Sequence, residues 1–215
     1  MRKLNLVICL LLIAVVCGAT LYYWPQLPEQ VPMHWNFAGQ VDRYGSRLSM
    51  LWIGPCMMIA MLLVGVVLPW LSPRGFDVKR FEPAFNYIIT LLVGLFAYIY
   101  AIQLAAILTG EMSVLHMTLA GLCVLMVLLG NQLGKVRRNF FIGVRTPWTL
   151  ANEQVWYATH RLSAKLMVAS GLAGLIALWA GAPSWLVLAL TSAWALVAVL
   201  YSLAYYKRLE KAGQL

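Results

Sequence analysis

Charged residues are scarce in this chain of 215 amino acids: Lys, Arg, Asp and Glu together make up only 11% of it. An ordinary soluble domain carries about 25%. Hydrophobic residues make up 62% of the chain, and a water-soluble core cannot bury that much apolar surface. The shortage of charge therefore excludes a soluble globular domain and predicts an all-α integral membrane protein.

Acidic residues are fewest of all, with 7 Asp and Glu against 16 Lys and Arg, which gives a net charge of +9. In a soluble protein this excess would suggest binding to nucleic acid. Here the basic residues gather at the ends of apolar runs, which is the pattern that the positive-inside rule produces. We therefore expect contact with the lipid bilayer and no direct binding to nucleic acid.

Cysteine occurs four times, always inside an apolar segment and never in a CxxC pair: Cys9, Cys17, Cys56 and Cys123. Such cysteines behave as small apolar residues, which excludes a disulfide framework or a zinc site. A metal site elsewhere would need three or four ligands. His34, Asp42 and Glu29 come nearest to such a group but lack ligand spacing, so we predict no metal and no cofactor.

Catalytic and transport signatures are also missing. The chain has no Gly-rich phosphate loop, HExxH, GxSxG or Ser-His-Asp constellation, so we predict that it is not an enzyme. No Asp, Glu, Lys or Arg lies deep within an apolar segment, where ion-coupled transporters usually place ionisable residues. Gln103 is one of the few polar residues found there.

Six apolar segments reach the roughly 20 residues that a bilayer core requires. They are predicted to span the membrane at residues 4–23, 48–71, 85–108, 113–133, 163–181 and 184–205. We expect one membrane domain covering residues 1–215, with no second soluble domain. The first segment ends in Tyr22, Tyr23 and Trp24, which are typical of an interfacial aromatic belt, so we expect it to be retained rather than cleaved.

The basic residues predict the orientation of this six-helix bundle. If the N-terminus is cytoplasmic, 14 of the 16 basic residues lie on the cytoplasmic side, and only Arg43 and Arg47 lie outside. The positive-inside rule therefore predicts an N-in/C-in protein with an even number of spans. In this orientation residues 24–47 form an external loop, and residues 134–162 lie in the cytoplasm.

The external loop, here called the proline-rich segment (residues 24–47), cannot be a regular helix because it contains Pro25, Pro28 and Pro32. Residues 30–36 and 41–44 flank a turn with a glycine, which predicts a small β-hairpin. The candidate binding residues of this segment are Pro32, His34, Asn36, Gly39 and Asp42.

The cytoplasmic stretch, here called the motif segment (residues 134–162), is polar, aromatic and basic between two apolar spans, which makes it the first candidate for function. Pro147 followed by Thr149 predicts a helix start, with Thr149 as the cap and Glu153 in the first turn. We therefore expect a short interfacial helix from about residue 150 that leads into the fifth span.

On that helix, Glu153, Tyr157 and Arg161 are spaced four residues apart and are expected to form a linked polar row, with Trp156 and His160 beside it. One interpretation is a polar pocket at the cytoplasmic mouth of the bundle. The other is an interfacial helix with Trp among the lipid headgroups and Arg on lipid phosphate. Spacing alone favours the second interpretation.

The pattern N-x-F-x-G-x-R-T-P-W-T-L, followed by W and then T-H-R, resembles the hallmark of the SdpI family of bacterial membrane proteins. The matching residues are Asn139, Phe141, Gly143, Arg145, Thr146, Pro147, Trp148, Thr149, Leu150, Trp156, Thr159, His160 and Arg161. The proline-rich segment resembles a second segment often found near the N-terminus of such proteins. It carries Pro28, Pro32, His34, Asn36, Gly39, Asp42 and Gly45.

The resemblance implies a multi-pass immunity protein of the bacterial cytoplasmic membrane. The family's namesake protects a producing cell from its own secreted peptide toxin and is thought to relay toxin presence by holding a cytoplasmic transcriptional repressor at the membrane. By resemblance, the proline-rich segment would meet the toxin and the motif segment would hold the repressor. The candidate binding residues of the motif segment are Asn139, Gly143, Arg145, Pro147, Trp148, Glu153, Trp156, His160 and Arg161.

Two other functions stay open at the level of sequence. A transporter or flippase for a peptide or lipid would use Glu153, Tyr157 and Arg161 as a cytoplasmic gate, with a polar path reaching Gln103. An interfacial membrane enzyme would use Glu153 and His160 as acid and base. The family resemblance and the missing catalytic motifs favour the immunity protein over both.

Overall fold

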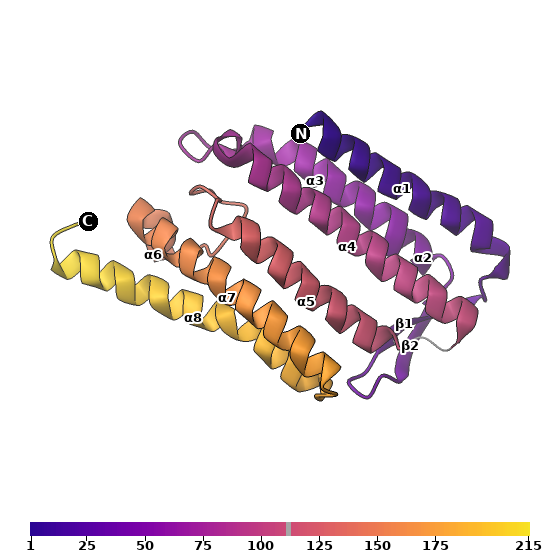
Figure 1. The fold of residues 1–215 in the computed structure, drawn as a ribbon. Helices are drawn as coiled ribbons and strands as arrows, with labels where there is room; N and C mark the ends of the chain where they lie inside the picture. Colours follow the sequence, from indigo (N-terminus) through magenta and orange to yellow (C-terminus); the bar gives the residue numbers. More distant parts are fainter. Residues whose placement is uncertain (111–112) are drawn as a thin grey trace.

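The computed structural model describes residues 1–110 and 113–215, most of them in long helices that lie side by side (Figure 1). Within the described residues, six helical stretches are long and apolar enough to cross a membrane, which confirms the predicted number and a multi-pass membrane protein. Five are single helices: α1 (Lys3–Tyr23), α4 (Glu82–Thr109), α5 (Val114–Leu133), α7 (Glu153–Trp179) and α8 (Ser184–Lys211). The sixth joins α2 (Ser49–Leu51), a π-helical turn (Trp52–Cys56) and α3 (Met57–Leu71).

The outer faces of these helices are apolar. Leu11 and Val15 on α1, Leu63 on α3 and Ile176 on α7 are all exposed in the isolated chain. In water such faces would be unfavourable, whereas lipid solvates them as well as a protein core does. The exposed faces are therefore the surfaces that contact the bilayer.

The helices pack as two groups joined in the middle. Helices α1, α3 and α4 pack together, α7 packs between α5 and α8, and the contact of α4 with α5 joins the groups. An apolar cluster of buried side chains lies where the motif segment meets the start of α4. It includes Phe81, Phe85, Val136 and Trp156. The motif segment is thus packed against both halves of the molecule.

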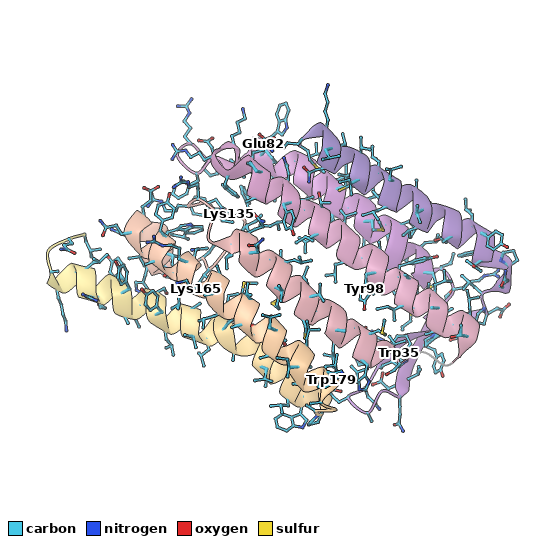
Figure 2. All side chains as sticks on the ribbon, viewed as in Figure 1. Trp35, Glu82, Tyr98, Lys135, Lys165 and Trp179 are labelled. Carbon is cyan, nitrogen blue, oxygen red and sulfur yellow. The ribbon has the colours of Figure 1, made fainter. Side chains whose placement is uncertain are left out.

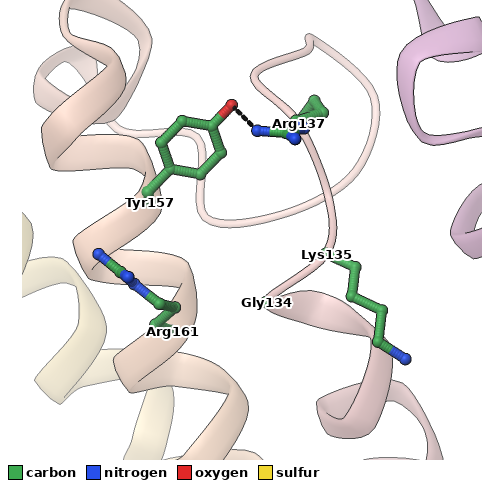
Figure 3. Close-up of a pocket in the computed structure, with 5 residues that line it drawn as sticks. All are labelled: Gly134, Lys135, Arg137, Tyr157 and Arg161. Carbon is green, nitrogen blue, oxygen red and sulfur yellow. Dashed lines mark hydrogen bonds between the residues drawn. The ribbon is translucent and has the colours of Figure 1, made fainter.

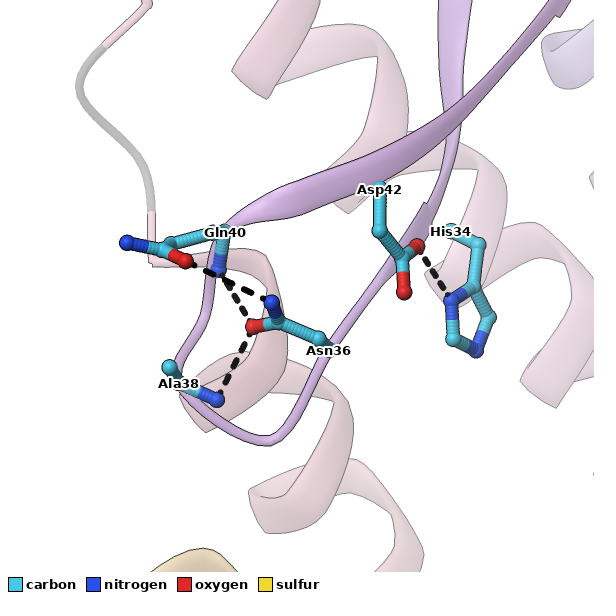
Figure 4. Close-up of polar contacts among 5 residues, drawn as sticks. All are labelled: His34, Asn36, Ala38, Gln40 and Asp42. Atoms are coloured by element: carbon cyan, nitrogen blue, oxygen red, sulfur yellow. Dashed lines mark hydrogen bonds and ion pairs between the residues drawn. The ribbon is translucent and has the colours of Figure 1, made fainter.

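The hairpin predicted in the proline-rich segment is confirmed. Strands β1 (Gln30–Trp35) and β2 (Val41–Ser46) pair in antiparallel fashion, with an irregular register after Pro32. The Oδ1 of Asn36 accepts the N–H groups of Ala38 and Gln40 at 2.9 and 3.0 Å, and Gly39 takes the positive φ of 77° that the turn requires (Figure 4). Candidate residues Asn36 and Gly39 therefore build the turn.

Buried Gln103 of α4 holds the hairpin to the bundle. Its Nε2 donates to the carbonyl oxygen of Pro32 at 2.8 Å and lies 3.6 Å from the sulfur of Met33. This polar residue, a weak candidate for a transport path, is engaged in a structural contact.

The hairpin and the motif segment lie at opposite ends of the bundle (Figure 1). Both chain termini lie at the end that carries the motif segment. The labelled side chains follow the same division, with Glu82 and Lys135 at the motif end and Trp35 and Trp179 at the hairpin end (Figure 2). Any molecule that touches both segments at once would have to reach across the whole length of the helices.

The start of α7 differs from the sequence prediction. Thr149 is not the cap of the helix that leads into the fifth span. Thr146 caps a separate five-residue helix, α6 (Pro147–Ala151), because Pro147 at its first position places the cap one residue earlier. Asn152 then caps α7 by accepting the N–H groups of Gln154 and Val155. From Glu153 onward α7 is continuous, so the polar helix and the fifth span are one element.

Candidate functional site

The loop between α5 and α6 is built around Asn139, whose side chain is fully buried. Its Oδ1 accepts the N–H groups of Phe141 and Ile142 at 2.7 and 2.8 Å. Its Nδ2 donates to the carbonyl oxygens of Arg137 and Ile142 at 2.7 and 3.0 Å. Because the loop itself occupies both ends of the amide, Asn139 determines the loop's shape and is not presented to a partner.

His160 on α7 closes the same loop from the other side. Its Nε2 accepts the N–H of Val144 at 3.0 Å, and its Nδ1 faces the carbonyl oxygen of Trp156 at 2.8 Å. A carbonyl can only accept, so the neutral ring carries its proton on Nδ1. Gly143 lies at the Nε2 edge of the ring with φ of 117°, where a Cβ would overlap Nε2. Gly143 and His160 therefore form one structural unit.

Trp156 is fully buried and joins the motif segment to the rest of the bundle. Its ring stacks on His160 with centroids 4.0 Å apart and an interplanar angle of 19°. Its Nε1 donates to the carbonyl oxygen of Val136 at 2.8 Å. In the apolar cluster it packs with Phe81 and Phe85 at the start of α4. This candidate residue is a core residue rather than an interfacial anchor.

Further polar contacts fix α6. The hydroxyls of Thr146 and Ser202 lie 3.0 Å apart and link α6 to α8. The guanidinium of Arg138 donates to the carbonyl oxygens of Leu150 and Ala151, which end α6. Such a basic group satisfies carbonyls that the helix leaves free. The guanidinium of Arg145 likewise donates to the carbonyl oxygen of Phe140.

The side chains that remain available form two separate surfaces. The first, here called the tip surface, consists of Arg145, Pro147, Trp148 and Glu153. Three of these residues are exposed and Trp148 is half-buried. They lie around α6 and the first turn of α7, at the end of the bundle where both chain termini lie (Figure 1).

The second surface, here called the cationic crevice, is a hollow of about 490 Å³ lined by Gly134, Lys135, Arg137, Tyr157 and Arg161 (Figure 3). Arg137 donates from Nη1 to the hydroxyl oxygen of Tyr157 at 2.6 Å, and its guanidinium carbon lies 5.2 Å from the centre of that ring. This hydrogen bond is the main reason that the pKa of Arg137 is raised above its ordinary value. Sequence reasoning missed Arg137, although it stands in the basic run of residues 135–138.

The predicted polar row on α7 does not form as expected. Tyr157 bonds to Arg137 of the loop, and no hydrogen bond links it to Glu153 or Arg161 among the described residues. Helical spacing correctly placed the three side chains on one face. It could not predict that Arg137, in the loop, would form the hydrogen bond to Tyr157.

The acid–base pair considered for an enzyme is also not assembled. Glu153 and His160 are seven residues apart on α7, roughly 10 Å along the helix axis. Glu153 is exposed, whereas His160 is buried with both ring nitrogens engaged.

At the opposite end of the bundle, the hairpin pairs two candidate residues. Nδ1 of His34 lies 2.6 Å from Oδ1 of Asp42, and both side chains are about half exposed (Figure 4). Pro32 stands at the contact with Gln103. Within residues 1–110 and 113–215, no group of three His, Cys, Asp or Glu side chains is placed to hold a metal ion.

Sequence comparisons relate both polar segments of the chain to known protein families. Residues 135–202 match the SdpI/YfhL protein family, and residues 11–59 match a domain of unknown function, DUF1648. The chain is 26% identical to "Immunity protein SdpI" of Bacillus subtilis (strain 168), over 98% of this chain and 99% of that protein. No solved structure matches the chain significantly. The resemblance to the SdpI family is therefore confirmed: residues 135–202 carry the SdpI/YfhL segment, in a membrane protein related over nearly its whole length to an immunity protein.

Proposed function

We propose that the chain is a membrane immunity protein that protects its cell against a secreted peptide toxin. The observation that carries the proposal is the relationship, over nearly the full length of both chains, to a protein named as an immunity protein. The six apolar helices fit a role that is carried out within the membrane.

The proposal includes an orientation in the bacterial cytoplasmic membrane with both termini inside the cell. It rests on the basic residues, of which 14 of 16 would then face the cytoplasm. In this orientation the hairpin faces outward, while α6 and the tip surface lie at the cytoplasmic interface.

The hairpin is the part of the chain that we propose meets the toxin. Phe37 in the turn and Tyr44 on β2 are 68% and 60% exposed, although they belong to a segment beyond the apolar helices. Aromatic side chains exposed in this way are typical of protein interaction surfaces. The exposed His34–Asp42 pair beside them adds a polar contact of fixed geometry.

Expression of the chain in a toxin-sensitive cell tests the immunity role. Cells that carry the chain should survive candidate peptide toxins that kill cells with an empty vector. Cells that carry the double variant F37S/Y44S should be killed at a toxin concentration about tenfold lower than cells that carry wild type. The reason is that two anchor side chains are lost from the interface. The matched variant F37Y/Y44F keeps both rings and should still protect.

Survival must be compared at equal amounts of chain in the membrane. Killing that is unchanged by wild-type expression would reject immunity to the toxins used. Protection that is equal in F37S/Y44S and wild type would reject the hairpin as the toxin contact.

We further propose that the tip surface holds a cytoplasmic transcriptional repressor when toxin is present. Arg145, Trp148 and Glu153 offer a cation, an aromatic ring and an anion on one compact surface that the bilayer does not cover in the proposed orientation. A fluorescent candidate repressor should move to the membrane on toxin exposure with wild type, and should remain in the cytoplasm with W148A/E153Q. A repressor that never moves in protected wild-type cells would reject the relay and leave immunity standing.

A further inference from the structure

The cationic crevice concentrates positive charge, and no acidic side chain forms an ion pair with it. The Glu153 carboxylate, one helical turn before Tyr157, is only the weakest of the causes that shift the pKa of Arg137. Lys135, Arg137 and Arg161 line it, and none of its lining residues is an Asp or Glu. In the described parts of the chain, the ion pairs are His34–Asp42 and Lys207–Glu210, both elsewhere. A hollow with three cations and no carboxylate in its lining is suited to an anionic ligand.

One cation of the crevice, Arg137, is held in place before a ligand arrives. Arg137 is fixed by its hydrogen bond to Tyr157 and by its position over the tyrosine ring. Because a guanidinium has five N–H donors and this bond uses one, Arg137 keeps donors for a ligand. The Tyr157 oxygen accepts from Arg137, and its own hydrogen has no acceptor among the described side chains and carbonyls. The tyrosine hydroxyl is therefore also free to donate.

Arg161 adds a second guanidinium to the same hollow. It stands one helical turn beyond Tyr157 on α7 and forms no hydrogen bond or ion pair in the described part of the chain. Lys135 contributes charge from a greater distance, because its Nζ donates to Gln132 at 3.2 Å and extends away from the arginines (Figure 3). Arg137 and Tyr157 already lie together, whereas the Arg161 side chain does not point toward Arg137 (Figure 3). Because Arg161 is exposed and unbonded, it can rotate toward a ligand that Arg137 and Tyr157 hold.

The position of the crevice along the helix axes indicates the source of the anion. Arg161 is eight residues into α7, roughly 12 Å further along the axis than the tip surface at Glu153. Gly134 directly follows the last residue of the apolar helix α5. The crevice thus lies where the apolar helices end, which is the level of the phosphate layer of a bilayer. A lipid phosphate is already at this height, whereas a soluble partner would first meet the tip surface.

We propose that the cationic crevice is a binding site for the phosphate group of an anionic phospholipid. Arg137 and Arg161 bind the phosphate oxygens, for which the planar guanidinium is well matched, and the Tyr157 hydroxyl supplies a third donor. The inference goes beyond the proposed immunity function and does not depend on it. It holds in either orientation, because both leaflets present phosphate.

Lipid binding by the purified full-length chain tests this inference. The chain is stripped of lipid in a neutral detergent and titrated with phosphatidylglycerol or phosphatidylcholine, and bound lipid is counted by native mass spectrometry. Wild type should prefer phosphatidylglycerol. R137Q/R161Q should weaken that binding by about tenfold or more, since two cations are lost at the phosphate. The control R208Q/K211Q removes equal charge from exposed positions on α8 and should leave binding within about twofold.

The variant Y157F separates a built site from general attraction to basic residues. It leaves every charge in place but removes one donor and the acceptor that positions Arg137. The proposal predicts weaker phosphatidylglycerol binding by about threefold to tenfold, which corresponds to one lost hydrogen bond. Attraction by charge alone predicts no change. Retained helical circular dichroism and an unchanged elution volume would confirm that each variant is folded.

Four results would overturn the inference. One is equal loss of binding in R137Q/R161Q and R208Q/K211Q, and another is unchanged binding in folded Y157F. The third is displacement of phosphatidylglycerol by glycerol phosphate at equal concentration, which would make a free phosphate the ligand and not a lipid. Binding of an acidic peptide to the crevice, with no preference among the lipids, would likewise replace the lipid by a protein partner.

Discussion

At the scale of single residues, the motif segment uses most of its polar side chains to hold itself in shape. Asn139 satisfies four backbone groups of the loop, and His160 accepts from Val144 while donating to Trp156. Buried polar groups are stable only when they are paired in this way. Substitutions at these residues would therefore disturb folding before they disturb any contact with a partner.

A substitution at Gly143 tests whether the contact with His160 stabilises the motif segment. G143A should lower the free energy of unfolding by about 2–4 kcal/mol, because it forces both an unfavourable φ and an overlap with His160. The matched variant G75A also places alanine at a positive φ, 86°, but in open space, and should lower it by only about 1 kcal/mol. Unfolding of each purified variant in mixed detergent gives the comparison. Equal losses in the two variants would show that the contact with His160 is unimportant.

At the scale of secondary structure, α7 is the central element of the C-terminal half. Its first two turns carry the cap, the crevice and the buried Trp156–His160 stack, and its remaining turns pack between α5 and α8. The close packing of α7 against α5 depends on small residues such as Gly171. At Gly171 a Cβ would lie 2.6 Å from the carbonyl oxygen of Cys123, a backbone atom that cannot move aside.

Enlarging Gly171 should therefore separate these two helices. G171A is expected to lower the free energy of unfolding by about 1–3 kcal/mol, as overpacking generally does. G18A on α1 is the control, since a Cβ there meets no atom within 4 Å. It should be neutral or stabilising by up to about 1 kcal/mol, because alanine is the better helix former. Thermal unfolding in detergent measures both, and equal stability of G171A and wild type would contradict the packing argument.

At the scale of the whole molecule, the bundle separates two polar segments by the full length of its helices. The hairpin is fastened to α4 through Gln103, and the motif segment is fastened to the other end of α4 through Trp156. A single helix thus contacts both segments. This arrangement gives the proposed division into an outer toxin contact and an inner repressor contact a physical basis.

Thiol labelling in intact cells tests the proposed orientation. A membrane-impermeant maleimide should label Q40C in the hairpin from outside, and should label E153C on the tip surface only after the cells are opened. Wild type is the background control, because Cys9 and Cys123 are buried and Cys17 and Cys56 are partly covered within the helices. Labelling of both variants in intact cells would refute the separation, and the reverse pattern would invert the orientation.

Much of the architecture could be predicted from the sequence because it depends on local patterns. The number of crossings follows from long apolar runs, since a lipid-exposed backbone has to satisfy its own hydrogen bonds as helix. The hairpin follows from prolines that forbid helix and from a glycine-bearing turn. The predicted cap at Thr149 was wrong by three residues, because the cap of α6 is Thr146. Both threonines suit a cap, and only the observed hydrogen bonds distinguish them.

The motif segment could be singled out from the sequence as a candidate site. The roles of its residues could not be assigned, because they depend on partners distant along the chain. Amino-acid order alone determined a membrane protein with six apolar helices, a hairpin and a motif segment. Only the tertiary structure decided that Asn139, Trp156 and His160 are internal supports, and that Arg137 bonds to Tyr157 twenty residues later. The physical reason is that hydropathy is a property of each residue, whereas a hydrogen bond between buried groups exists only once the chain has brought both of them together.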